Sequence, residues 1–66
     1  MVSETIRKVR EAAGLTQQQL GERCGYIGIK AQIYVARWEA GIRPVPKNKL
    51  KVISATLKIA LENLLE

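Results

Sequence analysis

Apolar residues recur at helical spacing along most of the chain. In the first such stretch, Ile6, Val9 and Ala13 lie at intervals of three and four residues, which is the pattern of a buried helical stripe. Ser3 is suited to cap this helix, and Gly14 is suited to end it, because glycine accepts the left-handed conformation at a helix C-terminus. We therefore predict a first helix from Ser3 to about Ala13.

A second, shorter helix is predicted over residues 17–24. Thr16 and Gln19 have the spacing of a capping box, in which each side chain binds the other residue's backbone N–H. Leu20 and Cys24 follow one turn apart on its inward stripe.

A third helix is predicted from about Ala31 to Ala40, with Gly41 at its end. Val35 and Trp38, spaced by three, form its buried side. The other side chains face outward or sideways, and these are Gln32, Ile33, Tyr34, Ala36 and Arg37.

Two short helices joined by a glycine-containing turn form a helix-turn-helix pattern, whose second helix fits the major groove of DNA. Gln32 and Arg37 are of the types that bind adenine and guanine edges with two hydrogen bonds, and an exposed Ile33 suits a thymine methyl group. We therefore assign these three residues to base contact. The competing interpretation is ordinary exposed helix for Gln32 and Arg37 and core for Ile33, since any small helical domain has capped helices joined by glycine turns.

The turn before the third helix, residues 25–30, is longer than the three or four residues of a minimal turn of this kind. Its apolar content favours packing of Ile27 and Ile29 on the core. Tyr26 and Lys30 are the alternatives for contact with a DNA phosphate, and we assign Lys30 to that role.

A stiff connector and a fourth helix follow. Pro44 and Pro46 restrict the backbone, and Pro46 suits a position near the first residue of the helix. Arg43 lies where a phosphate contact is natural. The fourth helix carries an apolar stripe of Leu50, Ile53 and Leu57 and a basic start of Lys47, Lys49 and Lys51. These lysines either contact the DNA backbone, a role we assign to Lys47, or form a solvated face.

The last stretch, residues 57–66, is rich in leucine and contains neither glycine nor proline. One straight helix from residue 47 would span about 30 Å and expose many of these side chains. We therefore expect a turn near residues 58–60 and a fifth helix that packs back on the core. The expected fold is an all-α, compact five-helix domain, in which any exposed leucine is a dimer contact.

The amino-acid composition reduces the number of function classes that fit the chain. Eleven Lys and Arg residues against six acidic residues, all Glu, give a net charge of +5, which supports a polyanionic partner but is also ordinary for a soluble domain. The absence of His and Asp and the single Cys argue against the usual zinc sites, His-based triads and internal disulfides. We expect one domain, in the cytoplasm, with no cofactor, no metal, no signal peptide and no enzymatic activity.

The sequence resembles the Cro and cI type of helix-turn-helix domain of lambdoid phage repressors and many bacterial regulators. The matching residues are Ile6 to Arg10, Gly14-Leu15-Thr16-Gln17, Leu20, Gly25, Val35, Arg37-Trp38-Glu39-Ala40-Gly41, Pro44 and Leu64-Leu65. The chain differs from this pattern by about four extra residues between Gly25 and the third helix, by Ala31 in place of a polar N-cap, and by Ile33 in place of a polar residue.

The resemblance implies a five-helix domain that binds operator DNA, usually as a two-fold dimer. It implies base contacts from Gln32, Ile33 and Arg37 and backbone contacts from Gln17, Tyr34 and Arg43. It also implies a partly buried salt bridge between Arg10 and Glu39 that joins the first and third helices.

Two classes of function follow. The first is a sequence-specific repressor of Cro type in a bacterial or phage-infected cell, which binds double-stranded operator DNA as a homodimer. The second is a protein-interaction module, such as an antitoxin-like partner, whose exposed Ile and Leu side chains form the interface. Preference for one operator and a steep loss of affinity with salt would identify the DNA-binding protein.

Overall fold

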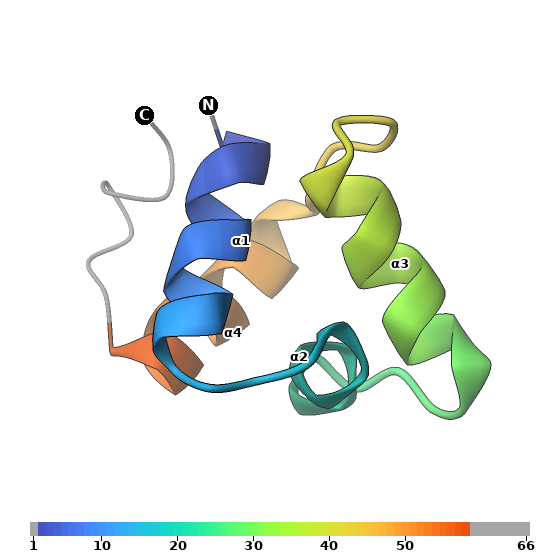
Figure 1. Ribbon diagram of the computed structural model, residues 1–66. Helices are drawn as coiled ribbons and strands as arrows, with labels where there is room; N and C mark the ends of the chain where they lie inside the picture. The colour runs from blue at the N-terminus through green and yellow to red at the C-terminus, as the bar shows by residue number, and fades with distance from the viewer. Residues whose placement is uncertain (1, 59–66) are drawn as a thin grey trace.

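The computed structural model describes residues 2–58, and these form four α-helices around one core (Figure 1). The helices are α1 (Val2–Ala12), α2 (Gln17–Arg23), α3 (Ile29–Glu39) and α4 (Lys47–Leu57). This described part of the chain contains four helices instead of the five expected, and it contains no strand. The expected fifth helix falls on residues 59–66, outside the described residues.

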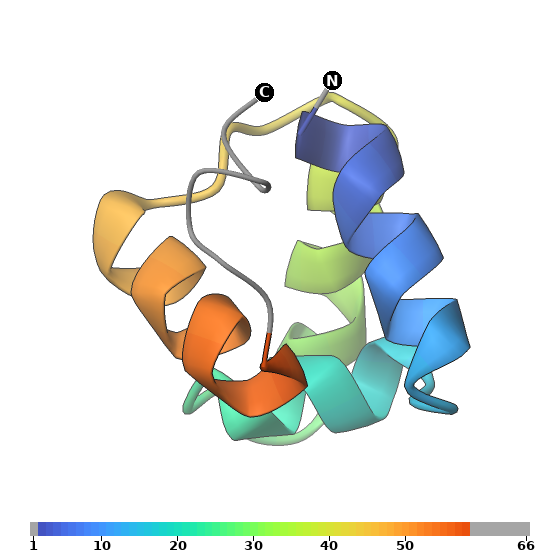
Figure 2. The same ribbon diagram turned by 90° about the vertical axis from the view of Figure 1, so that its left-hand side faces the viewer.

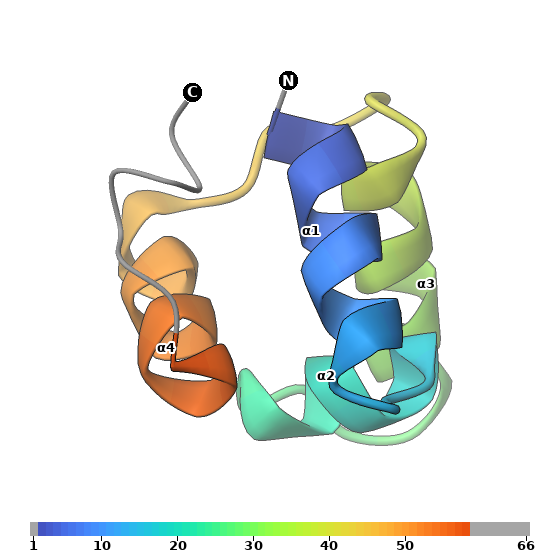
Figure 3. The same cartoon turned by 60° about the vertical axis from the view of Figure 1, so that its left-hand side comes forward.

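The short helix α2 connects the two sides of the domain. It packs against both α3 and α4, while α1 packs against α3. Figure 3 shows α1, α2 and α3 gathered on one side and α4 on the other, and Figure 2 shows α2 bridging them along the lower edge. No helix within residues 2–58 is long and apolar enough to cross a membrane.

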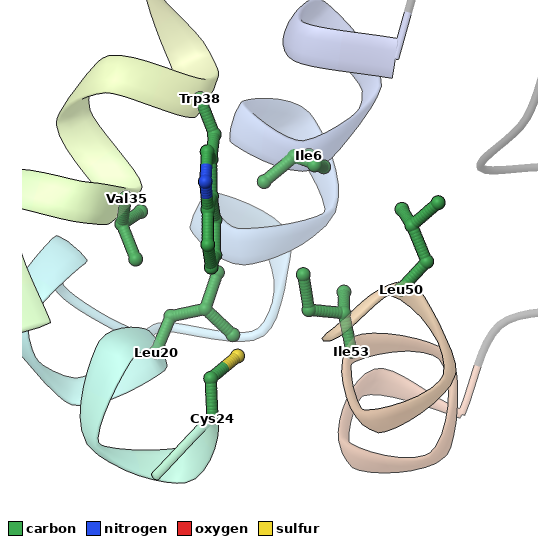
Figure 4. Close-up of a cluster of buried hydrophobic side chains, with 7 residues drawn as sticks. All are labelled: Ile6, Leu20, Cys24, Val35, Trp38, Leu50 and Ile53. Atoms are coloured by element: carbon green, nitrogen blue, oxygen red, sulfur yellow. The ribbon is translucent and has the colours of Figure 1, made fainter. Parts of the chain in front are cut away.

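The core draws side chains from every helix (Figure 4). Its buried members are Ile6, Leu20, Cys24, Val35, Trp38, Leu50 and Ile53. All seven were expected to face inward from their spacing, and that prediction is confirmed. Trp38 is only 2% exposed, and its ring extends into the middle of this group. Val9 and Leu57 are partly buried against the same cluster.

Two predictions for α1 were wrong. Ser3 lies inside the helix and does not cap it, because the helix already includes Val2. Ala13 is exposed, because α1 ends at Ala12 and the helical period no longer applies to the residue that follows.

The helix ends follow local rules that the sequence displays. The capping box at the start of α2 is present, with Gln19 N donating to Thr16 Oγ1 at 3.0 Å and Thr16 N donating to Gln19 Oε1 at 2.8 Å. At its other end, Gly25 has a φ of 96°. This conformation lets Gly25 N donate to Glu22 O at 3.0 Å and Tyr26 N to Gly21 O at 3.1 Å, which is a Schellman motif.

Helix α4 ends at Leu57, directly before residues 58–60, where a turn was expected. Lys58 follows the helix with a φ of 55°, in the left-handed region that non-glycine residues seldom adopt. At the start of α4, Pro46 is the N-cap and Lys47 the first helical residue.

Candidate nucleic-acid interface

The pair α2 and α3, joined by the turn of residues 24–28, forms a helix-turn-helix. The third helix begins at Ile29, so the predicted start at Ala31 was wrong. Gly28 is the N-cap and has φ 67° and ψ −149°, a conformation open essentially to glycine alone. Of the residues between Gly25 and Ala31, Ile29 and Lys30 therefore extend the helix at its N-terminal end, while Tyr26 and Ile27 remain in the turn.

The close approach of α2 and α3 explains why a small residue occupies position 31. Ala31 is fully buried in the first turn of α3 and faces Gly21 in the middle of α2. A Cβ atom on Gly21 would lie 2.2 Å from the backbone oxygen of Ala31, so only glycine permits this distance. This role of Gly21 was not predicted from the sequence. The available signal was a glycine inside a predicted helix, which costs about 1 kcal/mol relative to alanine and therefore suggests a packing reason.

The prediction that Ile27 and Ile29 pack on the core was wrong. Their exposed fractions are 85% and 72%. Ile29 belongs to the helix and lies on the face opposite Ala31 and Val35. Ile27 lies in the turn, just before the N-cap Gly28. The turn does fold back on the core, but it does so through Tyr26, which is partly buried there.

Tyr26 forms the centre of an aromatic cluster that holds α3 in place. Its ring stacks on Tyr34 with 4.5 Å between centroids and is tilted against Trp38 at 5.9 Å. Lys49 of α4 lies over the same ring, with Nζ 4.9 Å from the centroid, and donates to the backbone oxygen of Cys24 at 2.7 Å. Lys49 therefore joins α4 to the end of α2, unlike its exposed neighbour Lys47.

A cluster of three polar side chains on the other side of α3 connects α1, α2 and α3. Arg10 Nε donates to Glu39 Oε2 at 2.6 Å, and its Nη2 donates to Glu39 Oε1 at 3.2 Å. Both side chains are nearly buried, with 11% and 5% exposed, which confirms the salt bridge implied by the resemblance. The hydrogen bonds to Glu39 raise the pKa of Arg10 above its usual value. Gln17 Nε2 donates to the same carboxylate at 3.0 Å, so this half-buried side chain is held at the start of α2.

The outer face of α3 presents the residues assigned to base contact. Gln32 and Arg37 are exposed, and Ile33 is half-buried. In Figure 1, α3 lies along one edge of the molecule and its outer side points away from α1 and α4. The arrangement brings the three side chains to one accessible helix surface, with Tyr26 turned toward the core behind it.

The charged residues assigned to the DNA backbone are exposed, but they come from different parts of the chain. Lys30, Arg43 and Lys47 are exposed, at the start of α3, after its end and at the start of α4. Within the described residues, none of these three cations forms an ion pair. Tyr34 is half-buried by its stacking on Tyr26. In the same part of the chain, no group of three or more His, Cys, Asp or Glu residues is placed to hold a metal ion.

The fold and this surface define a helix-turn-helix domain. A family model described as helix-turn-helix matches residues 6–64. The chain belongs to this family and is a DNA-binding transcriptional regulator whose partner is double-stranded DNA. Neither the curated proteins nor the solved structures gave a significant match.

Proposed function

We propose that this protein is a Cro-like, sequence-specific repressor that binds a two-fold operator through the major groove. The observation that carries the proposal is the exposure of Gln32 and Arg37 on the outer face of α3. With α3 in the major groove, these two side chains bind the edges of adenine and guanine, and Ile33 contacts a thymine methyl group. Bound protein would cover the promoter and block it sterically.

Phosphate contacts supply much of the affinity and position α3 in the groove. Lys30 at the start of α3 and Arg43 after its end are exposed, which supports phosphate contacts from both ends of the helix. We assign a third such contact to Lys47, which is exposed at the start of α4. The ring of Tyr34 is fixed by stacking, which leaves its hydroxyl for a phosphate. Gln17 gives one amide hydrogen to Glu39 and keeps the second for a phosphate.

A two-fold operator requires two copies of the chain. We assign the contact between them to the segment from Pro44 to Lys47 and to the leucine-rich stretch of residues 59–66, outside the described residues. Half-sites about 34 Å apart, one turn of DNA, would match such a homodimer.

The test is selection of bound sequences from a pool of randomised DNA duplexes. We expect an enriched palindrome and an affinity that falls steeply with salt. Arg37→Ala should relax the preference at one base pair by about 1–3 kcal/mol, whereas Lys47→Ala should weaken all sequences alike. Lys8→Ala, which removes an exposed cation of α1, is the matched control and should leave binding nearly unchanged. An unaltered preference in Arg37→Ala would refute the assignment of base contact.

A second candidate function is a protein-interaction module, such as an antitoxin-like partner. The exposed side chains of Ile27, Ile29 and Ile42 favour it, because exposed apolar groups are typical of protein interfaces. This function predicts that no sequence is enriched from the DNA pool and that binding to DNA depends on charge alone.

A further inference from the structure

The first turn of α3 presents apolar surface to solvent. Ile29 is 72% exposed there, although a buried isoleucine side chain stabilises a fold by about 1.5–3 kcal/mol. A single exposed isoleucine would need no explanation. Here, however, Ile29 precedes Ile33 by four residues, so the two side chains share the outer face of α3 and form one apolar strip along it.

The side chains around this strip favour contact with DNA over contact with an apolar protein surface. Its exposed neighbours on α3 are Lys30, Gln32 and Arg37. The single carboxylate of α3 belongs to Glu39, which is turned inward onto Arg10. An apolar strip whose exposed neighbours on α3 are two cations and an amide is complementary to a major groove, where thymine methyl groups lie between rows of phosphates.

The spacing of the strip also matches the spacing of base pairs. Four residues of α-helix advance about 6 Å along the axis. Neighbouring base pairs are about 3.4 Å apart. With the axis of α3 along the groove, side chains at positions 29 and 33 would therefore reach methyl groups about two base pairs apart.

The first turn of α3 is held against α2 by a hydrogen bond and by a close backbone contact. Gln18 of α2 donates from Nε2 to the backbone oxygen of Gly28 at 2.9 Å and to Glu22 Oε2 at 3.0 Å. Ala31 is fixed by its backbone contact with Gly21. Binding would therefore order little more than the side chain of Ile29, at a cost below about 1 kcal/mol.

We propose that this first turn of α3 is a second base-contacting element, in which Ile29 packs against a thymine methyl group. Each half-site then carries two thymines about two base pairs apart, one contacted by Ile33 and one by Ile29. This inference rests on the proposed insertion of α3 into the major groove, and it names the bases that the groove must offer.

The experiment replaces single thymines by deoxyuridine, which lacks only the 5-methyl group. The probe is the palindrome enriched by the wild-type protein from the randomised pool, and each thymine of one half-site is replaced in turn, with the symmetric position replaced as well. We expect weaker binding at two positions, by about fourfold per methyl group, which corresponds to one buried carbon. Ile29→Ala should abolish the effect at one of these positions and keep it at the other, and Ile33→Ala should do the reverse.

Ile42→Ala is the matched control, because Ile42 is 73% exposed but lies beyond the end of α3. It should keep both effects. Ile29→Val keeps a shorter apolar side chain and should show a reduced effect at the same position, which guards against a general loss of affinity in Ile29→Ala. If Ile29→Ala and Ile29→Val keep the full wild-type pattern, the inference is wrong while the proposed function stands. If no palindrome is enriched at all, the proposed function fails together with the inference.

Discussion

Gly21→Ala tests whether α2 and α3 are held together by direct backbone contact. Two effects of opposite sign act at this position. Alanine has the higher helix propensity, which stabilises a helix interior by about 1 kcal/mol relative to glycine. The added Cβ atom, however, would lie 2.2 Å from the oxygen, 2.5 Å from the carbonyl carbon and 2.6 Å from the Cα of Ala31.

The steric effect should dominate. The contacting atoms all belong to the backbone of Ala31, so no side chain can rotate away and α3 must move by about 1 Å to restore an ordinary contact. Overpacking of this kind costs about 1–3 kcal/mol and occasionally more. Because the contact lies against main chain, we expect a steric cost at the upper end of that range, about 3 kcal/mol. The gain of about 1 kcal/mol from helix propensity reduces this to a net loss of about 2 kcal/mol. Such a loss lowers Tm by roughly 8–16 °C in a domain of this size.

Urea unfolding followed by fluorescence measures this loss, because the single tryptophan, Trp38, is 2% exposed in the folded chain. Circular dichroism provides an independent probe of the same transition. A double variant with Ala31→Gly should not recover the lost stability, since removing that side chain leaves the obstructing backbone in place. If Gly21→Ala were neutral, or more stable by the amount that propensity alone gives, the close approach of α2 and α3 would be wrong.

Three further predictions concern stability at the edges of this site. Arg10→Met should cost about 3 kcal/mol or more in urea unfolding, because it leaves the nearly buried carboxylate of Glu39 without its cation; an unchanged midpoint would contradict this. Lys49→Met should cost about 1.5–3 kcal/mol in the same assay, through the lost hydrogen bond to Cys24 O; a loss confined to DNA affinity would instead indicate a phosphate contact. Burial raises the pKa of Cys24 and of Tyr26, so the unfolded chain loses these protons first. The free energy of unfolding should therefore fall as pH rises above about 8.5, and Cys24→Ala should reduce the first part of that fall in a pH series.

Local rules were enough to predict the parts of the fold that depend on near neighbours in the sequence. The capping box of Thr16 and Gln19 involves residues three positions apart, and the helix end at Gly25 depends on one residue's backbone freedom. The inward stripes followed in the same way, because spacing alone places Val35 and Trp38 on one side of a helix.

The burial of Ala31 inside α3 depends on a partner distant in sequence and therefore escaped prediction. Ala31 resembles a poor N-cap until Gly21 is seen beside it, and that contact exists only in the folded chain. Ile27 and Ile29 were misplaced because apolar character was taken to imply burial, although apolar groups also make up much of any protein surface. The link from Arg10 to Glu39 came from the family resemblance, since nothing in their spacing pairs them. The DNA contacts assigned to individual residues stay predictions.

The inner side of α3 is buried in the core, and its outer side faces solvent. The side chains that attach it to the domain lie on its inner side, on its flank or at its end, and they are Ala31, Tyr34, Val35, Trp38 and Glu39. The exposed side chains of Gln32 and Arg37 on the outer side take no part in this attachment. Substitutions among the outer residues thus carry little folding penalty, and the two sides can change independently during evolution. A lineage of such proteins could acquire a new target through a handful of exchanges on one surface while inheriting an unaltered scaffold.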